Sequence, residues 1–142
     1  MISTGDIIGA WKLTKWRIEH DDGRVRYPFG RDAYGQILYT HDYRMSAVIM
    51  RQARPCFAQE SARQLTIDQK ADAFDSYFHY SGRWVIENHD LIHTVEFSLN
   101  QGFIGTKQRR HAQMSGDRNL VLSAQEKSNG GAIRHHYLEW RR

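Results

Sequence analysis

The sequence predicts an all-β protein, an antiparallel barrel of eight to ten strands that carries one helix. Short segments of β-type residues recur along the chain, and turn residues bound them. A single segment has helical periodicity instead. Closing the sheet into a barrel removes the unpaired edges that an open sheet would expose. A two-sheet sandwich is the structural alternative, and strands of about ten residues favour the barrel.

The expected strands follow one another with short connections. Asn129 and Gly130, within the turn Ser128–Gly131, supply the positive φ angles that tight hairpins require. The segments 34–41 with 43–50, and 80–87 with 90–99, are expected to form hairpins. In chain order, the strand segments are residues 9–19, 34–41, 43–50, 80–87, 90–99, 103–114, 118–125 and 132–141.

Residues 66–78 interrupt this series of strand segments. Thr66 and Gln69 match a capping box, in which the hydroxyl and the amide each satisfy a free backbone N–H group. The apolar residues recur every three to four positions, whereas the aspartates lie on other faces. We therefore expect an amphipathic helix that lies against the barrel or across one end. The apolar positions are Ile67, Ala71, Phe74 and Phe78.

Length and composition narrow the class of protein. A chain of 142 residues is the usual size of one domain, so residues 1–142 are expected to form a single barrel. The lone Cys56 excludes an internal disulfide and favours a reducing compartment. The N-terminus has no basic region followed by an apolar run, and no apolar run is long enough to span a membrane. We expect a cytoplasmic protein with no membrane partner.

The net charge of +4 raises the question of nucleic-acid binding. The basic residues are scattered, however, and even the densest cluster, 107–111, matches no helix-turn-helix, zinc-finger or RNA-recognition pattern. A solvated basic face is the better interpretation, so no nucleic-acid partner is expected.

Alternation along the strands predicts which side chains face the interior. In residues 103–114, the side with Lys107, Arg109, His111 and Gln113 is expected to face solvent. The opposite side then brings two polar residues, Gln108 and Arg110, inward among apolar neighbours. The full inward set is Ile104, Thr106, Gln108, Arg110, Ala112 and Met114.

The same rule assigns the other strands. In residues 90–99 the apolar set brings His93 with it, and in residues 132–141 the even-numbered side is expected to face inward. The inward sets are Ile37, Tyr39 and His41; Tyr80, Gly82, Trp84 and Ile86; His93, Val95, Phe97 and Leu99; and Arg134, His136, Leu138 and Trp140.

Polar residues inside a barrel need partners. A buried Arg110 requires an anion, water or a dipole opposite it. The alternative is that Arg110 stacks on Trp11 or Trp140 and closes the barrel floor. His93 has a comparable alternative, a core histidine that is hydrogen-bonded to a tyrosine. The inward aromatic residues serve equally well as core or as lining.

An ordered set of short motifs spans nearly the whole chain: Gly9-Ala10-Trp11, residues 27–30, 35–40, 43–47, 73–77, 80–83, 93–98 and 105–110, Gly116-Asp117-Arg118, and Trp140-Arg141-Arg142. It resembles the lipocalin-like domain family of bacterial and fungal intracellular proteins. The resemblance implies a barrel with a small-molecule cavity, and it places His93, Gln108 and Arg110 in the motifs without assigning them catalysis. Some lipocalin-like proteins of natural-product pathways are cyclases or isomerases.

No nucleophile elbow, phosphate-binding loop, dinucleotide fingerprint or zinc-protease motif occurs. Because His135 and His136 are adjacent on a strand, they face opposite ways and cannot share a metal ion. Haem held by one inward histidine is a minor alternative, and we expect no cofactor and no metal. Acid–base and electrostatic chemistry remains, with His93, Arg110 and Tyr39 as catalytic candidates.

Two functions follow from this pattern. The first is binding of a small, mostly apolar or aromatic molecule, including one with an anionic group. The second is a cofactor-independent cyclase or isomerase that acts on a polyketide- or terpene-like intermediate. A structural or interaction barrel without a cavity is the third class, and a homodimer through exposed strands is compatible with each. The ligand-binding candidates are Gln108, Tyr80, Trp84, Phe97, His136 and Trp140.

Overall fold

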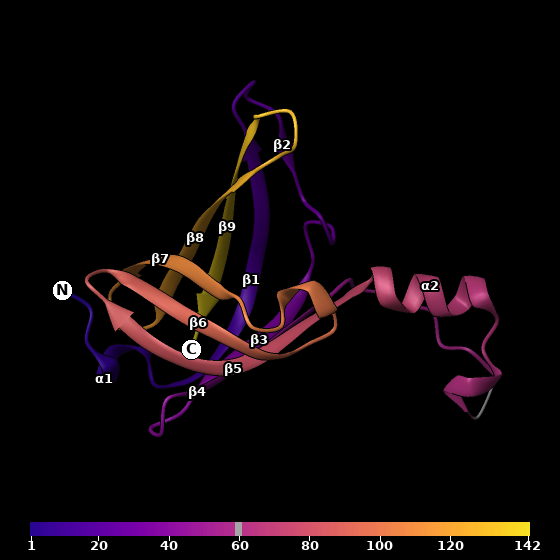
Figure 1. The fold of residues 1–142 in the computed structure, drawn as a ribbon, viewed down its shortest axis with the longest axis horizontal. Helices are drawn as coiled ribbons and strands as arrows, with labels where there is room; N and C mark the ends of the chain where they lie inside the picture. Colours follow the sequence, from indigo (N-terminus) through magenta and orange to yellow (C-terminus); the bar gives the residue numbers. More distant parts are fainter. Residues whose placement is uncertain (59–60) are drawn as a thin grey trace.

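A computed structural model describes residues 1–58 and 61–142 of the chain. Within them, nine antiparallel strands form one sheet that closes on itself (Figure 1). The elements are α1 (Thr4–Ile7), β1 (Gly9–His20), β2 (Val25–Arg26), β3 (Tyr34–Tyr39), β4 (Arg44–Met50), η1 (Ala62–Gln64), α2 (Ile67–Asp75), β5 (Tyr77–Glu87), β6 (Asp90–Ser98), η2 (Gln101–Phe103), β7 (Lys107–Ser115), β8 (Asn119–Lys127) and β9 (Ile133–Arg141).

Strand β1 closes the barrel because it pairs with a neighbour on each side. Its first half pairs with β3, with Trp11 opposite Ile37, and its second half pairs with β9, with Trp16 opposite Leu138. Eight strands therefore form a closed ring, and the short β2 is an extra strand at the far end of β1. The predicted antiparallel barrel is confirmed.

The ring is not hydrogen-bonded along its full height. Strand β7 pairs with β8 only through residues 111–115, so residues 107–110 have no partner on β8. Residues 124–127 of β8 pair with β9 alone, whereas residues 119–123 pair with both β7 and β9. In Figure 1 the upper parts of β1, β8 and β9 rise together away from β6 and β7. The barrel wall is thus interrupted beside Gln108 and Arg110.

Two register shifts change which side chains face inward. In β1 the shift between Leu13 and Lys15 inserts Thr14, so that Trp16 lies on the inner face as Trp11 does. In β6 the shift opposite Ser81 and Gly82 pairs Phe97 with the outward Ser81. Cross-strand partners lie on the same face of a sheet, and a bulge reverses the alternation.

The prediction that Phe97 faces inward is therefore wrong. Its side chain is 62% exposed. Two other assignments fail because their residues lie outside regular strand: His41 lies in the turn after β3, and Ile104 follows the 3-10 helix η2 ahead of β7. Both are exposed.

One end of the barrel is closed by a compact apolar core. The indole N–H of Trp11 donates to the carbonyl of Ile7 at 2.9 Å, which ties α1 to β1. The guanidinium of Arg142 lies 4.3 Å from the centre of the Trp11 ring. Arg142, and not Arg110, therefore stacks on the tryptophan at this end.

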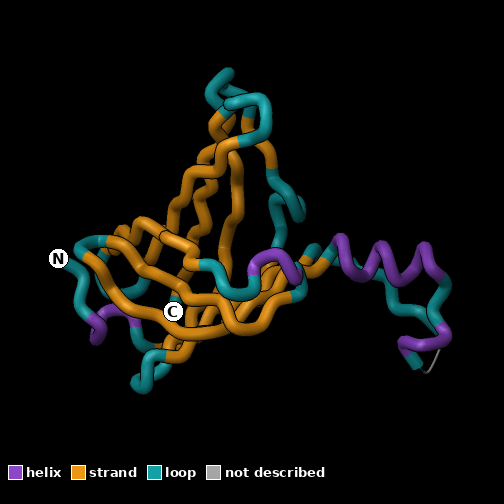
Figure 2. The backbone as a smooth tube through the Cα atoms, viewed as in Figure 1, coloured by secondary structure: helices purple, strands orange, loops and turns teal. Residues whose placement is uncertain are grey.

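Helix α2 begins as predicted, but its position is different. The capping box of Thr66 and Gln69 is present. The helix ends at Asp75, and Phe78 belongs to β5. In Figures 1 and 2, α2 projects sideways from the barrel at the end of β4 and β5. Ile67 is 86% exposed and Phe74 is 51% exposed, so the expectation of a helix packed on the barrel is wrong.

The projection of α2 follows from where the paired strands end. Met50 and Tyr77 form the last pair between β4 and β5, and α2 lies beyond this pair. Arg54 holds the returning end of α2, since it donates to the carbonyl of Ala73 at 3.1 Å and to the hydroxyl of Ser76 at 3.0 Å. In the described part of the chain, no helix has the length and apolar character needed to cross a membrane.

Candidate functional site

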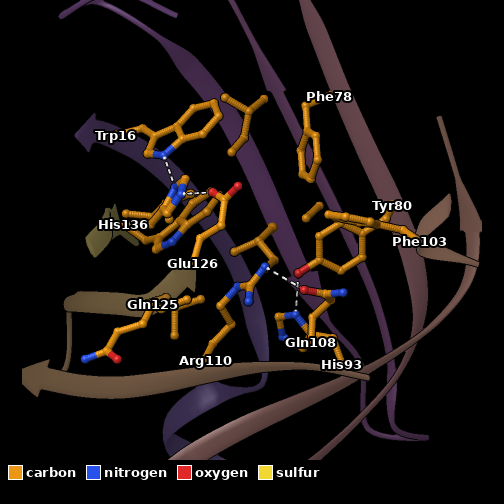
Figure 3. A pocket seen from close by; sticks show the side chains of 17 residues that line it. Trp16, Phe78, Tyr80, His93, Phe103, Gln108, Arg110, Gln125, Glu126 and His136 are labelled. Carbon is orange, nitrogen blue, oxygen red and sulfur yellow. Dashed lines mark hydrogen bonds and ion pairs between the residues drawn. The ribbon is translucent and has the colours of Figure 1, made fainter. Parts of the chain in front are cut away.

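A cavity of about 310 Å³ lies inside the barrel, and its wall is mainly apolar. Side chains from all eight strands of the closed ring reach it, together with one from η2 (Figure 3). This volume falls within the usual range for small-molecule sites. The lining residues are Trp16, Ile37, Ala47, Ile49, Phe78, Tyr80, His93, Phe103, Gln108, Arg110, Leu122, Ala124, Gln125, Glu126, His136, Leu138 and Trp140.

The floor of the cavity contains a histidine between two tyrosines. Tyr80 Oη is hydrogen-bonded to His93 Nδ1 at 2.6 Å, and Tyr39 Oη is hydrogen-bonded to His93 Nε2 at 2.8 Å. All three side chains are buried, and His93 has no exposed surface. His93 and Tyr80 line the cavity, whereas Tyr39 lies behind His93 in the core.

Burial keeps this group of three uncharged. Desolvation lowers the pKa of His93 from 6.5 to about 3, and the positive charge of Arg110 contributes to the decrease. Desolvation also raises the pKa of both tyrosines above 10, while Arg110 opposes this rise. At neutral pH the floor is therefore a neutral imidazole between two neutral phenols.

Arg110 and Gln108 stand side by side on the inner face of β7, at the interruption in the wall. Gln108 is fixed because its Nε2 donates to Thr106 Oγ1 at 2.8 Å. Arg110 donates to Gln108 Oε1 at 3.5 Å and to the carbonyl of Arg109 at 3.0 Å. Among the described residues, no carboxylate forms an ion pair with Arg110. Its charge therefore faces the cavity without a protein counter-ion.

A second polar cluster lies at the mouth of the cavity. Trp16 Nε1 donates to His136 Nδ1 at 3.3 Å, and His136 Nε2 lies 2.7 Å from Glu126 Oε2. Since an indole N–H only donates, Nδ1 must accept, and Nε2 carries the proton toward Glu126. Desolvation lowers the pKa of His136, and Glu126 opposes this effect. Figure 3 shows these three side chains opposite Phe78 and Tyr80.

Aromatic rings form part of the cavity wall, beside aliphatic side chains. Phe78 contacts Tyr80 and Phe103 edge to face, at centroid distances of 5.6 and 6.1 Å. The indole N–H of Trp140, which also lines the cavity, is buried without a hydrogen-bond partner in the described structure. Such a wall suits a flat apolar or aromatic molecule.

The structure brings together six of the nine candidate site residues. The three others do not reach the cavity: Tyr39 lies behind His93, Phe97 points outward, and Trp84 packs in the core. Trp84 contacts Tyr39 edge to face at 5.1 Å and donates to the carbonyl of Thr40 at 3.3 Å. The six that line the cavity are His93, Arg110, Gln108, Tyr80, His136 and Trp140.

The sequence analysis did not anticipate that Trp16 and Glu126 line the cavity. Trp16 faces inward only because of the bulge at Thr14, which has no sequence signature. Glu126 shares the inner face of β8 with Leu120, Leu122 and Ala124, so alternation along 118–127 carried a signal for it. An acidic residue at the end of an apolar inner face marks the mouth of the cavity.

A second hollow, of about 570 Å³, lies beside β7, β8 and β9, and it shares Ala124, Gln125 and His136 with the barrel cavity. Its charged groups are paired with one another, since Asp90 contacts Arg109 at 2.7 Å and His111 at 3.0 Å. Among residues 1–58 and 61–142, no cluster of three or more His, Cys, Asp or Glu side chains is arranged to hold a metal ion. The barrel cavity is therefore the stronger candidate site.

A family model described as a lipocalin-like domain matches residues 8–142. No curated protein matches the sequence. Similar solved structures include "Structure of a redesigned beta barrel, b11L5F_LGL", at 10% identity and a TM-score of 0.45, covering 98% of this chain and 93% of that one. Another is "Structure of EF1p2_mFAP2b bound to DFHBI", at 13% identity and a TM-score of 0.47, covering 97% and 94%.

A third similar structure is described as "De novo design of a fluorescence-activating beta barrel". It has 14% identity and a TM-score of 0.43, and the match covers 100% of this chain and 99% of that one. These distant similarities concern the fold and not the ligand.

Proposed function

Because this chain belongs to the lipocalin-like domain family, we propose that it binds a small, mostly apolar or aromatic molecule inside the barrel. The observation that carries the proposal is the cavity of about 310 Å³, whose wall is mainly apolar and contains a few polar groups. Burying an apolar molecule in such a cavity is favourable by roughly 25 cal/mol per Å² of apolar surface removed from water. A cytoplasmic location stays a prediction of the sequence.

The polar groups indicate which kind of apolar molecule fits. Arg110 has no carboxylate partner in the described structure, and it borders the cavity beside Gln108. An unpaired guanidinium next to a low-dielectric cavity favours an anionic group on the ligand. We therefore propose a ligand with an aromatic or apolar body and a negatively charged or strongly polar end.

The second candidate function is a cofactor-independent cyclase or isomerase that acts on a polyketide- or terpene-like intermediate. It is favoured by the convergence of Arg110 and Tyr80 at one end of an apolar cavity, where negative charge on a substrate oxygen would be stabilised. Against it, both ring nitrogens of His93 are already hydrogen-bonded, and its pKa of about 3 makes it a weak base at neutral pH. Binding is thus the first proposal.

Calorimetric titration with 2-naphthoate tests the proposal, because this probe combines an aromatic body with a carboxylate. We expect a dissociation constant below about 100 µM. Leu122→Trp fills the cavity and should weaken binding at least about tenfold, and Ala124→Phe, nearer the mouth, should weaken it less. Val121→Trp is the matched control, since the neighbouring side chain of β8 is not part of the cavity wall.

The proposal fails if 2-naphthoate does not bind the wild-type protein. It also fails if the Leu122 and Ala124 variants, verified as folded by circular dichroism, bind as tightly as the Val121 control. Replacing Arg110 with methionine, which keeps the apolar stem, separates the charge from the shape. We expect that change to weaken 2-naphthoate more than naphthalene.

A further inference from the structure

The floor of the cavity carries a directional chain of hydrogen bonds. Tyr39, His93 and Tyr80 form it in that order, at 2.8 and 2.6 Å, and only the first of them does not line the cavity. The direction in which each hydroxyl donates follows from counting donors and acceptors.

A neutral imidazole has one N–H donor and one acceptor nitrogen. In the described structure, the Tyr39 hydroxyl has no hydrogen-bond partner other than His93 Nε2. If Nε2 carried the proton, Tyr39 would have to accept, and its own O–H would be left unsatisfied in the core. Buried donors rarely remain unsatisfied. Tyr39 therefore donates to Nε2, and the ring proton is on Nδ1.

Because Nδ1 carries the ring proton, the Tyr80 oxygen must be the acceptor in its hydrogen bond with His93. His93 Nδ1–H donates to Tyr80 Oη at 2.6 Å, and the positive charge of Arg110 lowers the pKa of Tyr80 against the effect of burial. The Tyr80 oxygen thus accepts a hydrogen bond from His93. Its own O–H needs an acceptor elsewhere, and Tyr80 borders the cavity.

Tyr80 is held rigidly in this position. Its ring packs edge to face against Phe78 at 5.6 Å and Phe103 at 6.2 Å. A donor that is already aimed costs little to organise when a ligand arrives. The hydrogen bond that the phenol oxygen accepts from His93 also polarises its O–H, which strengthens the bond that it gives.

We propose that the Tyr80 hydroxyl donates a hydrogen bond to an oxygen acceptor of the ligand, and that Tyr39 and His93 fix the direction of this bond. The inference rests on the proposed binding function and narrows it. The ligand is an apolar or aromatic molecule that carries a carbonyl or carboxylate oxygen at the end that reaches the floor. Tyr39 is a positioning residue that acts through His93.

Two neutral probes of the same shape isolate the hydrogen bond. 2-Acetylnaphthalene has a carbonyl oxygen where 2-isopropenylnaphthalene has a methylene group. By equilibrium dialysis, we expect the wild-type protein to bind the ketone at least about fivefold more tightly. Tyr80→Phe should bring this ratio to about one. Tyr137→Phe, a phenol that lies outside the cavity wall, should keep the ratio.

Tyr39→Phe provides the test of the positioning role. The substitution does not alter the wall of the cavity, but it removes the donor to Nε2. We expect the ratio of the two affinities to fall between those of the wild-type protein and Tyr80→Phe. Nitrogen-15 spectra of the His93 ring in the wild-type protein should show a protonated Nδ1 and an unprotonated Nε2.

Each remaining outcome contradicts a stated step. Equal affinities for the two probes, or a preference that survives Tyr80→Phe, overturn the inference but leave the binding function standing. A proton on Nε2, or a ratio unaffected by Tyr39→Phe, overturns the positioning role and the direction of the chain. If neither probe binds, the proposed function fails and the inference with it.

Discussion

Two histidines of the cavity have opposite surroundings. His93 at the floor has no exposed surface and lies between two neutral phenols. His136 at the mouth is 18% exposed and lies between the indole of Trp16 and the carboxylate of Glu126. Both have both ring nitrogens hydrogen-bonded, and burial lowers both pKa values.

The two sites differ in how their surroundings affect a positive charge on the histidine. At the mouth, Glu126 opposes the effect of burial on the pKa of His136, and solvent is close. At the floor no carboxylate faces His93 in the described structure, and Arg110 adds a further unfavourable charge. The floor is therefore a site of fixed neutral hydrogen bonds, whereas the mouth tolerates charged groups.

The largest expected effect is on stability, from His93→Phe. The substitution leaves the buried Tyr39 hydroxyl without a partner, which costs up to about 3 kcal/mol of the free energy of unfolding. The double variant His93→Phe with Tyr39→Phe should recover most of that loss, because both polar groups are then gone. Urea denaturation measures each value. A double variant no more stable than the single one would contradict this account of the floor.

The next effect is a loss of stability in acid. The pKa of His93 is about 3 in the folded protein and about 6.5 when unfolded. Between these values the unfolded state binds more protons, so stability falls as the pH drops below about 6.5. By pH 5 the loss from His93 should be about 2 kcal/mol. Urea denaturation at pH 7, 6 and 5 measures it.

His93→Phe serves as the control for this pH dependence. The carboxylates contribute to both proteins, so the difference between the two stability curves isolates His93. Parallel curves for the wild-type protein and the variant would show that His93 titrates normally. The neutral floor would then be wrong, and the contrast with the mouth would disappear.

The smallest expected effect concerns the mouth. Glu126→Gln should change stability by less than about 0.5 kcal/mol, because this side chain is half exposed. It should nevertheless lower the pKa of His136 further, since the carboxylate is what raises it. Proton NMR of the imidazole between pH 4 and 8 reports the pKa. A pKa that rises on this substitution would contradict the assignment.

Many of the side chains on the inner face of the barrel could be predicted from the sequence. Alternation placed Gln108 and Arg110 on the inner face of β7 and His93 on that of β6, because these stretches are regular strand. The interpretation of His93 as a core histidine bonded to a tyrosine also agrees with the structure. Alternation failed at Phe97 and did not reveal Trp16, since each lies beyond a bulge.

Helix α2 also has one feature that the sequence predicts, its start, and one that it does not, its position. Its capping box involves residues within one helical turn, so Thr66 and Gln69 by themselves predict where the helix starts. Its position relative to the barrel depends on where β4 and β5 stop pairing, and no pattern within residues 66–78 carries that information.

Local patterns were thus sufficient for the strands, the helix start and the polarity of β7. Those properties depend on residues near one another in the chain, through periodicity, capping and turn chemistry. The group of Tyr39, His93 and Tyr80 needed the assembled barrel, because it joins three strands whose registers set the distances. The depressed pKa of His93 has the same origin, since only packing from several strands removes water from a side chain.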